Sequence, residues 1–217
     1  MNDLFSNSHV SAAVYFTDQG HYIFKYKSHD RLITKNLRAQ EVSSAFTLET
    51  MDSGWITPGI QRTGFNSQGD WFVYYMPACR LNLYLDESGT RWCVPIPPTV
   101  LIGVKKTIYL FAMAGTSFDP KGKVYTAPFP NIHSDGKVCW GKNQAPQVDP
   151  KKAKDAWFLF FNTPFNGDLA ADKCKKFPKD VRDYLKFLAG KQTYPTNTMR
   201  VCYASLDGLV ERLVVKQ

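Results

Sequence analysis

Residues 123–141 read Lys-Val-Tyr-Thr-Ala-Pro-Phe-Pro-Asn-Ile-His-Ser-Asp-Gly-Lys-Val-Cys-Trp-Gly, and this stretch decides how the rest of the chain is interpreted. Val124 and Tyr125 predict a short strand. Pro128 and Pro130 follow, and each proline fixes φ and removes a hydrogen-bond donor, so the backbone beyond the strand is stiff. The next residue, Asn131, belongs to a type that hydrogen-bonds its own local backbone and holds a loop in shape.

A cysteine closes this stretch. Asp135-Gly136 is a turn signal, and Cys139 follows it directly, with Lys137 before it and Lys142 after it. Nearby cations favour the thiolate form of a cysteine, which is the nucleophilic form. The pattern therefore predicts a reactive thiol, although composition alone favours a cysteine that only fills space in the core.

Composition restricts the class of protein. The 217 residues allow one large domain or a domain with an extension, and the 44% hydrophobic and 21% charged content is typical of a folded globular chain. No apolar run approaches the ~18–20 residues of a membrane span, and the N-terminus lacks a signal-peptide pattern, so we expect a cytoplasmic protein without a membrane partner.

The five cysteines and the net charge exclude other classes. Cys79, Cys93, Cys139, Cys174 and Cys202 are too widely spaced for a zinc site, and we expect neither a metal nor a cofactor. We also expect the other four cysteines to be structural. The charge of +8 indicates an acidic protein partner at least as well as nucleic acid. The lysines are spread along the chain, so we do not expect nucleic-acid binding.

Residues 1–69 predict a β-rich extension packed on a core formed by residues 70–217. Residues 10–16 and 22–26 are β-rich and flank a turn at Asp18, which predicts a hairpin. Residues 36–48 fit a helix loosely. Residues 52–69 are rich in turn residues and predict a loop.

From Asp70 the pattern predicts successive strands with short connections. They cover residues 71–75, 81–85, 91–96, 100–104 and 107–112. Strands with such short connections form an antiparallel meander.

Helical patterns follow the cysteine stretch. Asp149 and Pro150 suit a helix start, and the apolar residues 153, 156, 157, 160 and 161 share one face. A second helix is predicted from Pro178 to Gly190. A third is predicted over residues 205–214, although Asp207-Gly208 also fits a hairpin. Strands followed by helices predict an α+β fold with helices on one side or one end of an antiparallel sheet.

This order of elements resembles the ubiquitin-conjugating enzyme (UBC) fold over roughly residues 70–190. Those enzymes carry His-Pro-Asn, a loop, and then Gly-x-(Ile/Val)-Cys. This chain has Phe129-Pro130-Asn131 and then Gly136-Lys137-Val138-Cys139, with eight residues from Asn131 to Cys139 as is common in that family.

Within that superfamily, the chain most resembles the bacterial family D conjugating-enzyme-like proteins, which include protein B of the PRTRC cassette. The resemblance implies three partners: a ubiquitin-like protein, a ThiF-type activating enzyme and a JAB-type peptidase. There are departures, because Phe129 replaces the family histidine, Trp140 replaces a leucine, and the Trp-Ser-Pro that follows the cysteine in eukaryotic enzymes is missing.

The resemblance implies a transferase that accepts the ubiquitin-like protein as a thioester on Cys139 and passes it to an acceptor amine. Asn131 would hold the loop and donate to the developing oxyanion. His133 and Asp149 are the nearest candidates for the group that takes the proton from the amine. A solvent-exposed loop histidine is the alternative interpretation of His133.

Two other functions remain open from the sequence. The chain could be a UBC-fold adaptor that binds a ubiquitin-like protein without transferring it, although an adaptor does not need the thiol. Nucleic-acid binding is supported by the net charge alone.

Overall fold

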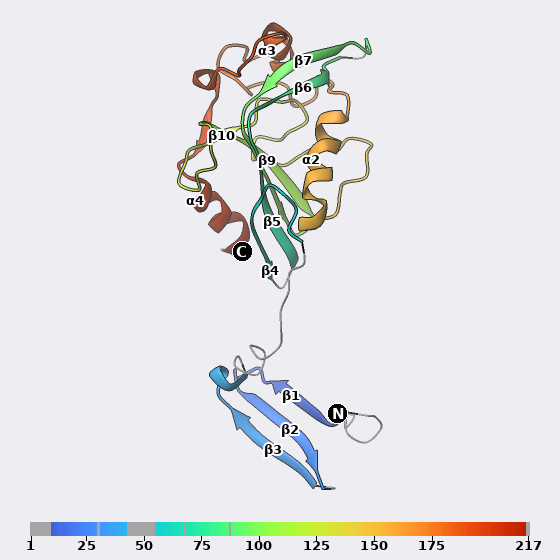
Figure 1. The fold of residues 1–217 in the computed structure, drawn as a ribbon, viewed down its shortest axis with the longest axis vertical. Coiled ribbons are helices and arrows are strands. Elements are labelled where there is room, and N and C mark those ends of the chain that lie inside the picture. Colours follow the sequence, from blue (N-terminus) through green and yellow to red (C-terminus); the bar gives the residue numbers. More distant parts are fainter. Residues whose placement is uncertain (1–9, 30, 43–54, 67, 87, 216–217) are drawn as a thin grey trace. The chain divides into compact units, whose positions relative to one another are not determined.

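A computed structural model describes residues 10–29, 31–42, 55–66, 68–86 and 88–215 (Figure 1). The chain divides into two compact units, Met1–Gly54 and Trp55–Gln217. No helix among the described residues is long and apolar enough to cross a membrane.

The first unit contains a three-stranded antiparallel sheet in the order β1-β2-β3, formed by Ala12–Phe16, Tyr22–Ser28 and Arg31–Leu37. The predicted hairpin is confirmed, because β1 pairs with β2 throughout its length. The strand β3 was not predicted. Of the helix expected over residues 36–48, residues 39–42 form a single helical turn, and residues 43–48 lie outside the described part of the chain.

A six-stranded antiparallel sheet forms the centre of the second unit, in the order β11-β10-β9-β8-β5-β4. Its strands, in the same order, are Val201–Tyr203, Val124–Thr126, Thr107–Met113, Thr99–Val104, Gly69–Met76 and Ile60–Asn66. The edge strand β4 pairs with β5 up to the turn at Asn66 and Gly69. Residues 60–66 are therefore not a loop, and the two units divide after Gly54 rather than after Gly69.

The strands β6 (Cys79–Tyr84) and β7 (Arg91–Ile96) pair only with each other and form a separate two-stranded sheet. The expected meander is antiparallel as predicted, but it omits this hairpin, since β5 pairs directly with β8 from Trp71↔Val104 to Met76↔Thr99. The burial of the two strands agrees with a central place for β8 and a separate place for β6. Every residue of β8 is buried, whereas β6 is exposed at alternate positions, as expected of a strand with one solvated face.

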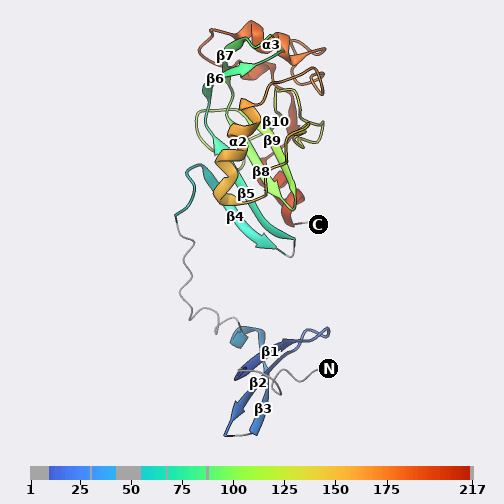
Figure 2. The same cartoon turned by 90° about the vertical axis from the view of Figure 1, so that its right-hand side faces the viewer.

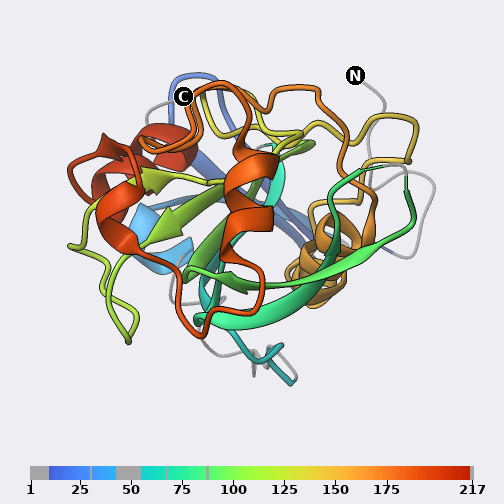
Figure 3. The same ribbon diagram turned by 90° about the horizontal axis from the view of Figure 1, so that it is seen from above.

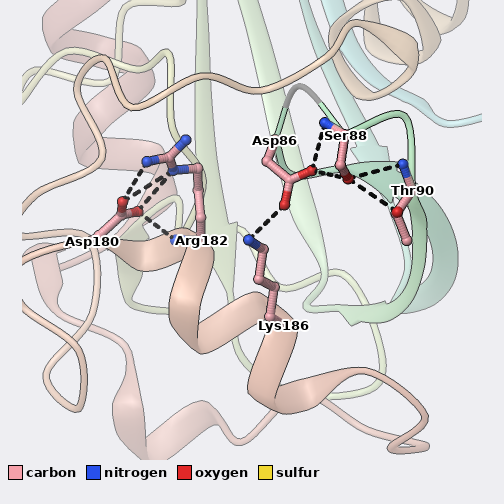
Figure 4. A network of polar contacts seen from close by, with 6 residues as sticks. All are labelled: Asp86, Ser88, Thr90, Asp180, Arg182 and Lys186. Atoms are coloured by element: carbon pink, nitrogen blue, oxygen red, sulfur yellow. Dashed lines mark hydrogen bonds and ion pairs between the residues drawn. The ribbon is translucent and has the colours of Figure 1, made fainter.

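Helix α3 (Val181–Leu188) lies beside β7 (Figure 2), and an ion pair joins it to the turn of the β6–β7 hairpin. Lys186 Nζ lies 2.6 Å from the carboxylate of Asp86, in the turn after β6, and Ser88 donates to the same carboxylate (Figure 4). Hydrogen bonding to Lys186 and then to Ser88 lowers the pKa of Asp86 to about 2. Helix α3 begins after Asp180, whose side chain accepts from Arg182 N, and not at Pro178 as predicted.

Side chains alternate along each strand, so the six-stranded sheet contributes residues to a core on each of its faces. Phe72, Tyr74 and Leu101 point into one core, which α2 (Ala153–Asn162) and α3 cover. Val73 and Ile102 point into a second core, covered by α4 (Leu206–Val210). Figure 3 shows α4 (red) and α2 (gold) on opposite sides of the strands. The expectation that all helices lie on one side or end of the sheet is therefore wrong.

Two further helix predictions are confirmed. Asp149 caps a 3₁₀ turn, Pro150–Lys152, that leads into α2. Ser205 caps α4, which continues as a π-helical turn, Glu211–Val215, so the hairpin alternative at Asp207-Gly208 is wrong. Another 3₁₀ turn, Thr196–Thr198, precedes β11.

A buried hydrogen bond ties α2 to the sheet, and its removal gives a testable prediction. Trp157 Nε1 donates to Thr99 Oγ1 at 2.9 Å, and both side chains are buried. Thr99→Val keeps the shape but leaves the indole N–H unpaired, so we expect a loss of about 1–3 kcal/mol in the free energy of unfolding. Urea denaturation measures it. Thr107→Val, at a half-buried position of β9, should stay within about 0.5 kcal/mol of wild type; equal losses in the two variants would contradict the prediction.

Candidate active site

Residues 131–139 form a small hairpin that places Asn131 opposite Cys139. Cys139 N donates to Asn131 O at 2.8 Å, and His133 N donates to Lys137 O at 2.8 Å. Gly136 N closes the turn by donating to His133 O at 3.0 Å. In this register Asn131 and Cys139 lie opposite each other on the two arms. The spacing of eight residues between them is therefore the length of the hairpin that brings them together.

The Cys139 arm of the hairpin docks on β9. Val138 N donates to Ile108 O, and Leu110 N donates to Gly136 O, both at 2.9 Å. Gly136 is required here for two reasons. Its φ of +91° lies in the left-handed region, and a Cβ atom at this position would lie 2.2 Å from the ring of Phe111. The glycine thus allows the turn to approach the sheet closely.

The Asn131 arm is held from its outer side by residues 168–173. Asn131 N donates to Asp168 O at 3.1 Å, and Lys173 Nζ donates to Ile132 O at 2.5 Å. Asn131 has a φ of +60°, a conformation that asparagine tolerates better than most residues. Burial lowers the pKa of Lys173, although Asp135 and Asp172 oppose this shift.

Phe129, which replaces the family histidine, anchors the start of the loop by aromatic packing. Its ring is fully buried and makes an edge contact with Phe161, with the ring centroids 4.9 Å apart. It also contacts Phe160 and is stacked with Phe165, each at 6.4 Å. The loop is therefore fixed to α2 and the segment after it by rings rather than by a polar side chain.

A pocket of about 230 Å³ opens at the hairpin and contains both Cys139 and Asn131. Both residues are partly exposed, so solvent and a ligand can reach them. Within the described residues, the side-chain amide of Asn131 has no hydrogen-bond partner, which leaves it free to donate to a ligand. The other residues of the wall are Trp140, Gly141, Lys142, Asn143, Phe160, Thr163, Pro164, Asn166 and Asp168.

Two of the four predicted site residues lie outside this pocket wall. His133 is exposed on the turn of the hairpin. The carboxylate of Asp149 accepts from Lys151 N at 2.8 Å as the helix cap, and Asp149 lines a different pocket with Asp70 and Lys105. The structure thus brings Asn131 and Cys139 together and places the two candidate bases elsewhere.

Asp168 is the carboxylate in the wall of the pocket, and sequence reasoning missed it. It is exposed, and Asn166 Nδ2 donates to its carboxylate at 2.8 Å while Asp168 N donates to Asn166 Oδ1 at 3.0 Å. The only local signal was Asn166-Gly167-Asp168, a turn-forming run after α2. Nothing in that run indicates that the turn reaches the Cys139 hairpin.

Three of the other cysteines are poor candidates for nucleophiles. Burial raises the pKa of Cys79 and Cys174, and it raises the pKa of Cys202 to about 11. Such thiols stay protonated at neutral pH, and the thiolate is the reactive form.

The turn glycine gives a second prediction. Gly136→Ala should destabilise the protein by roughly 1–3 kcal/mol more than Gly141→Ala, because its Cβ would overlap the Phe111 ring. Gly141 is the matched control, since its φ is also positive (+57°) but a Cβ added there would meet open space. Urea denaturation of both variants measures the difference, and equal losses would show that only the backbone conformation matters.

One of three comparisons with known proteins found a match. The family described as prokaryotic E2 family D matches residues 33–201, which include the hairpin, the pocket and most of the six-stranded sheet. No match was found among curated proteins or among solved structures. The mixed α/β architecture with antiparallel sheets and few helices is consistent with an E2-like fold. The chain belongs to prokaryotic E2 family D.

Proposed function

We propose that the protein is a conjugating enzyme that carries a ubiquitin-like protein as a thioester on Cys139. The observation that carries the proposal is the hairpin pairing of Asn131 with Cys139 inside an open pocket that also contains Asp168. A nucleophile, an unpaired amide donor and a carboxylate in one pocket are the groups that acyl transfer to an amine requires.

In the first half-reaction, the Cys139 thiolate attacks the thioester that joins the C-terminal glycine of the ubiquitin-like protein to a cysteine of the activating enzyme. A bond forms from Cys139 Sγ to the carbonyl carbon, and the activating enzyme's thiolate leaves. The tetrahedral intermediate carries a negative oxygen. Asn131 donates its side-chain amide to this oxygen, and losing such a donor typically costs about 10²–10³ in rate.

In the second half-reaction, an acceptor amine attacks the thioester and Cys139 leaves as a thiolate. The amine must lose a proton, and we assign its removal to Asp168, a residue of the pocket wall whose carboxylate can attract the ammonium form and accept the proton. Asn166 orients this carboxylate through the hydrogen bond to its Oδ2 atom. Asp168 therefore replaces His133 and Asp149 as the proposed amine-activating group.

The partners follow from this chemistry. The thioester donor must be an activating enzyme that has already consumed ATP, and the ThiF-type enzyme expected from the sequence would supply it. The JAB-type peptidase would remove the ubiquitin-like protein from its acceptor.

Mixing the protein with the activating enzyme, the ubiquitin-like protein and ATP should give an adduct that a thiol reductant cleaves. Cys139→Ala should abolish this adduct, because the Sγ atom is the acceptor. Cys202→Ala, which removes a cysteine of β11 that is not part of the pocket wall, should leave it unchanged. Non-reducing electrophoresis shows both results. An adduct that persists in Cys139→Ala would contradict the assignment, and binding without any adduct in the wild type would favour the adaptor alternative.

Asp168→Asn should slow discharge of the charged enzyme to free lysine by about 10²-fold or more, because general base catalysis is typically worth that much. Formation of the thioester should change little, since no amine is deprotonated in that step. Asp183→Asn, which removes an exposed carboxylate on α3, is the control. Equal discharge rates in wild type and Asp168→Asn, followed in a single turnover, would remove Asp168 from the mechanism.

A further inference from the structure

The outer edge of the active-site hairpin would be an open sheet edge without residues 168–173. The Ile132↔Val138 bridge lies between the two inter-arm hydrogen bonds, from Cys139 N and from His133 N. The N–H and C=O of Ile132 in such a pair point away from the partner arm. The carbonyl of Ile132 therefore needs a donor from another part of the chain, because Ile132 is fully buried.

Lys173 supplies that missing donor. Its Nζ donates to Ile132 O, and the whole residue is only 5% exposed. Thr99 is the other buried polar or charged residue among those described. A buried lysine is costly unless it is hydrogen-bonded, so a single lysine directed at one carbonyl beside Asn131 is a specific arrangement.

We propose that Lys173 is a positioning residue for acyl transfer, which fixes the Asn131 arm of the hairpin so that the Asn131 amide and Cys139 Sγ meet the same carbonyl group. This inference rests on the proposed function. Asn131 N donates to Asp168 O, and the Lys173 ammonium donates to the carbonyl of the next residue, Ile132. Residues 168–173 therefore form a bracket along the free edge of the hairpin. The opposite arm is already fixed by β9, and only the Asn131 arm depends on this bracket.

Two nearby carboxylates favour the charged, ammonium form of Lys173. Asp135, in the turn of the hairpin, and Asp172, the preceding residue, are the carboxylates that raise the pKa of Lys173 against the effect of burial. Asp172 also contacts Arg200 at 3.5 Å. The two carboxylates that act on Lys173 thus lie on different segments, Asp135 on the hairpin and Asp172 on the bracket.

The test measures transfer from the charged activating enzyme to Cys139 in a single turnover, as a function of the concentration of this protein. Lys173→Met keeps the length of the side chain but removes the donor. We expect the saturating rate constant to fall about 10- to 100-fold, the range that a small misplacement of reacting groups produces. We expect the half-saturating concentration to stay within about twofold, because no binding surface changes.

Lys175→Met is the matched control, since Lys175 is an exposed lysine two residues further along the chain and its Nζ donates to Asn197 O rather than to the hairpin. It should transfer at the wild-type rate. A loss of general stability would lower the amplitude of the reaction rather than its rate constant. An unchanged rate constant in Lys173→Met, or an equal fall in Lys175→Met, would overturn the inference while leaving the thioester function intact.

Two further measurements test the inference even if Lys173→Met does not fold or no thioester forms. Lys173→Arg retains a cationic donor, so it should fold and recover most of the rate even where Lys173→Met does not fold; a rate as low as that of Lys173→Met would overturn the role of the cation. Amide hydrogen exchange needs no activity. Lys173→Met should accelerate exchange at Asn131 and Cys139 but not in β5 and β8, whereas unchanged exchange at Asn131 would overturn the inference even if no thioester forms.

Discussion

The hydrogen bond from Cys139 N to Asn131 O is the constraint on which the rest of the site depends. It sets the register of the hairpin, and the register decides which side chains face the pocket. One arm continues the sheet by pairing with β9, and this pairing is possible because Gly136 approaches the ring of Phe111. The sheet in turn is rigid because its central strands are buried on both faces, between α2 and α4. Cys139 is thus connected through backbone hydrogen bonds to the most buried part of the protein.

The parts of the fold that could be predicted are those with a strong local signal. The helix caps at Asp149 and Ser205 and the buried strands β8 and β9 carry such signals, and the structure confirms them. The strand β4 was missed because it is an edge strand with polar residues and Gly64 in its middle. The separation of β6 and β7 from the sheet was missed for a different reason, since a strand pattern does not identify its partner.

The residues of the site also divide into those with a local sequence signal and those without one. Asn131 and Cys139 were predicted as a pair because both lie in one short stretch, where spacing and turn residues describe the geometry, and the hairpin does bring them together. Asp168 and Lys173 reach the pocket and the hairpin only through the tertiary path of the chain after α2. No local pattern encodes that path. Asp149 was chosen as a nearby carboxylate, but its sequence position also suits a helix cap, and in the structure its side chain makes the cap hydrogen bond.

The ring of Phe129 has a consequence for the way the loop responds to pH. A histidine at this position would change its charge between about pH 5 and 8, and a loop that it supports would respond to that change. A phenyl ring carries no ionisable proton, and the rings around it belong to Phe160, Phe161 and Phe165. The anchor of the loop is therefore indifferent to acidification.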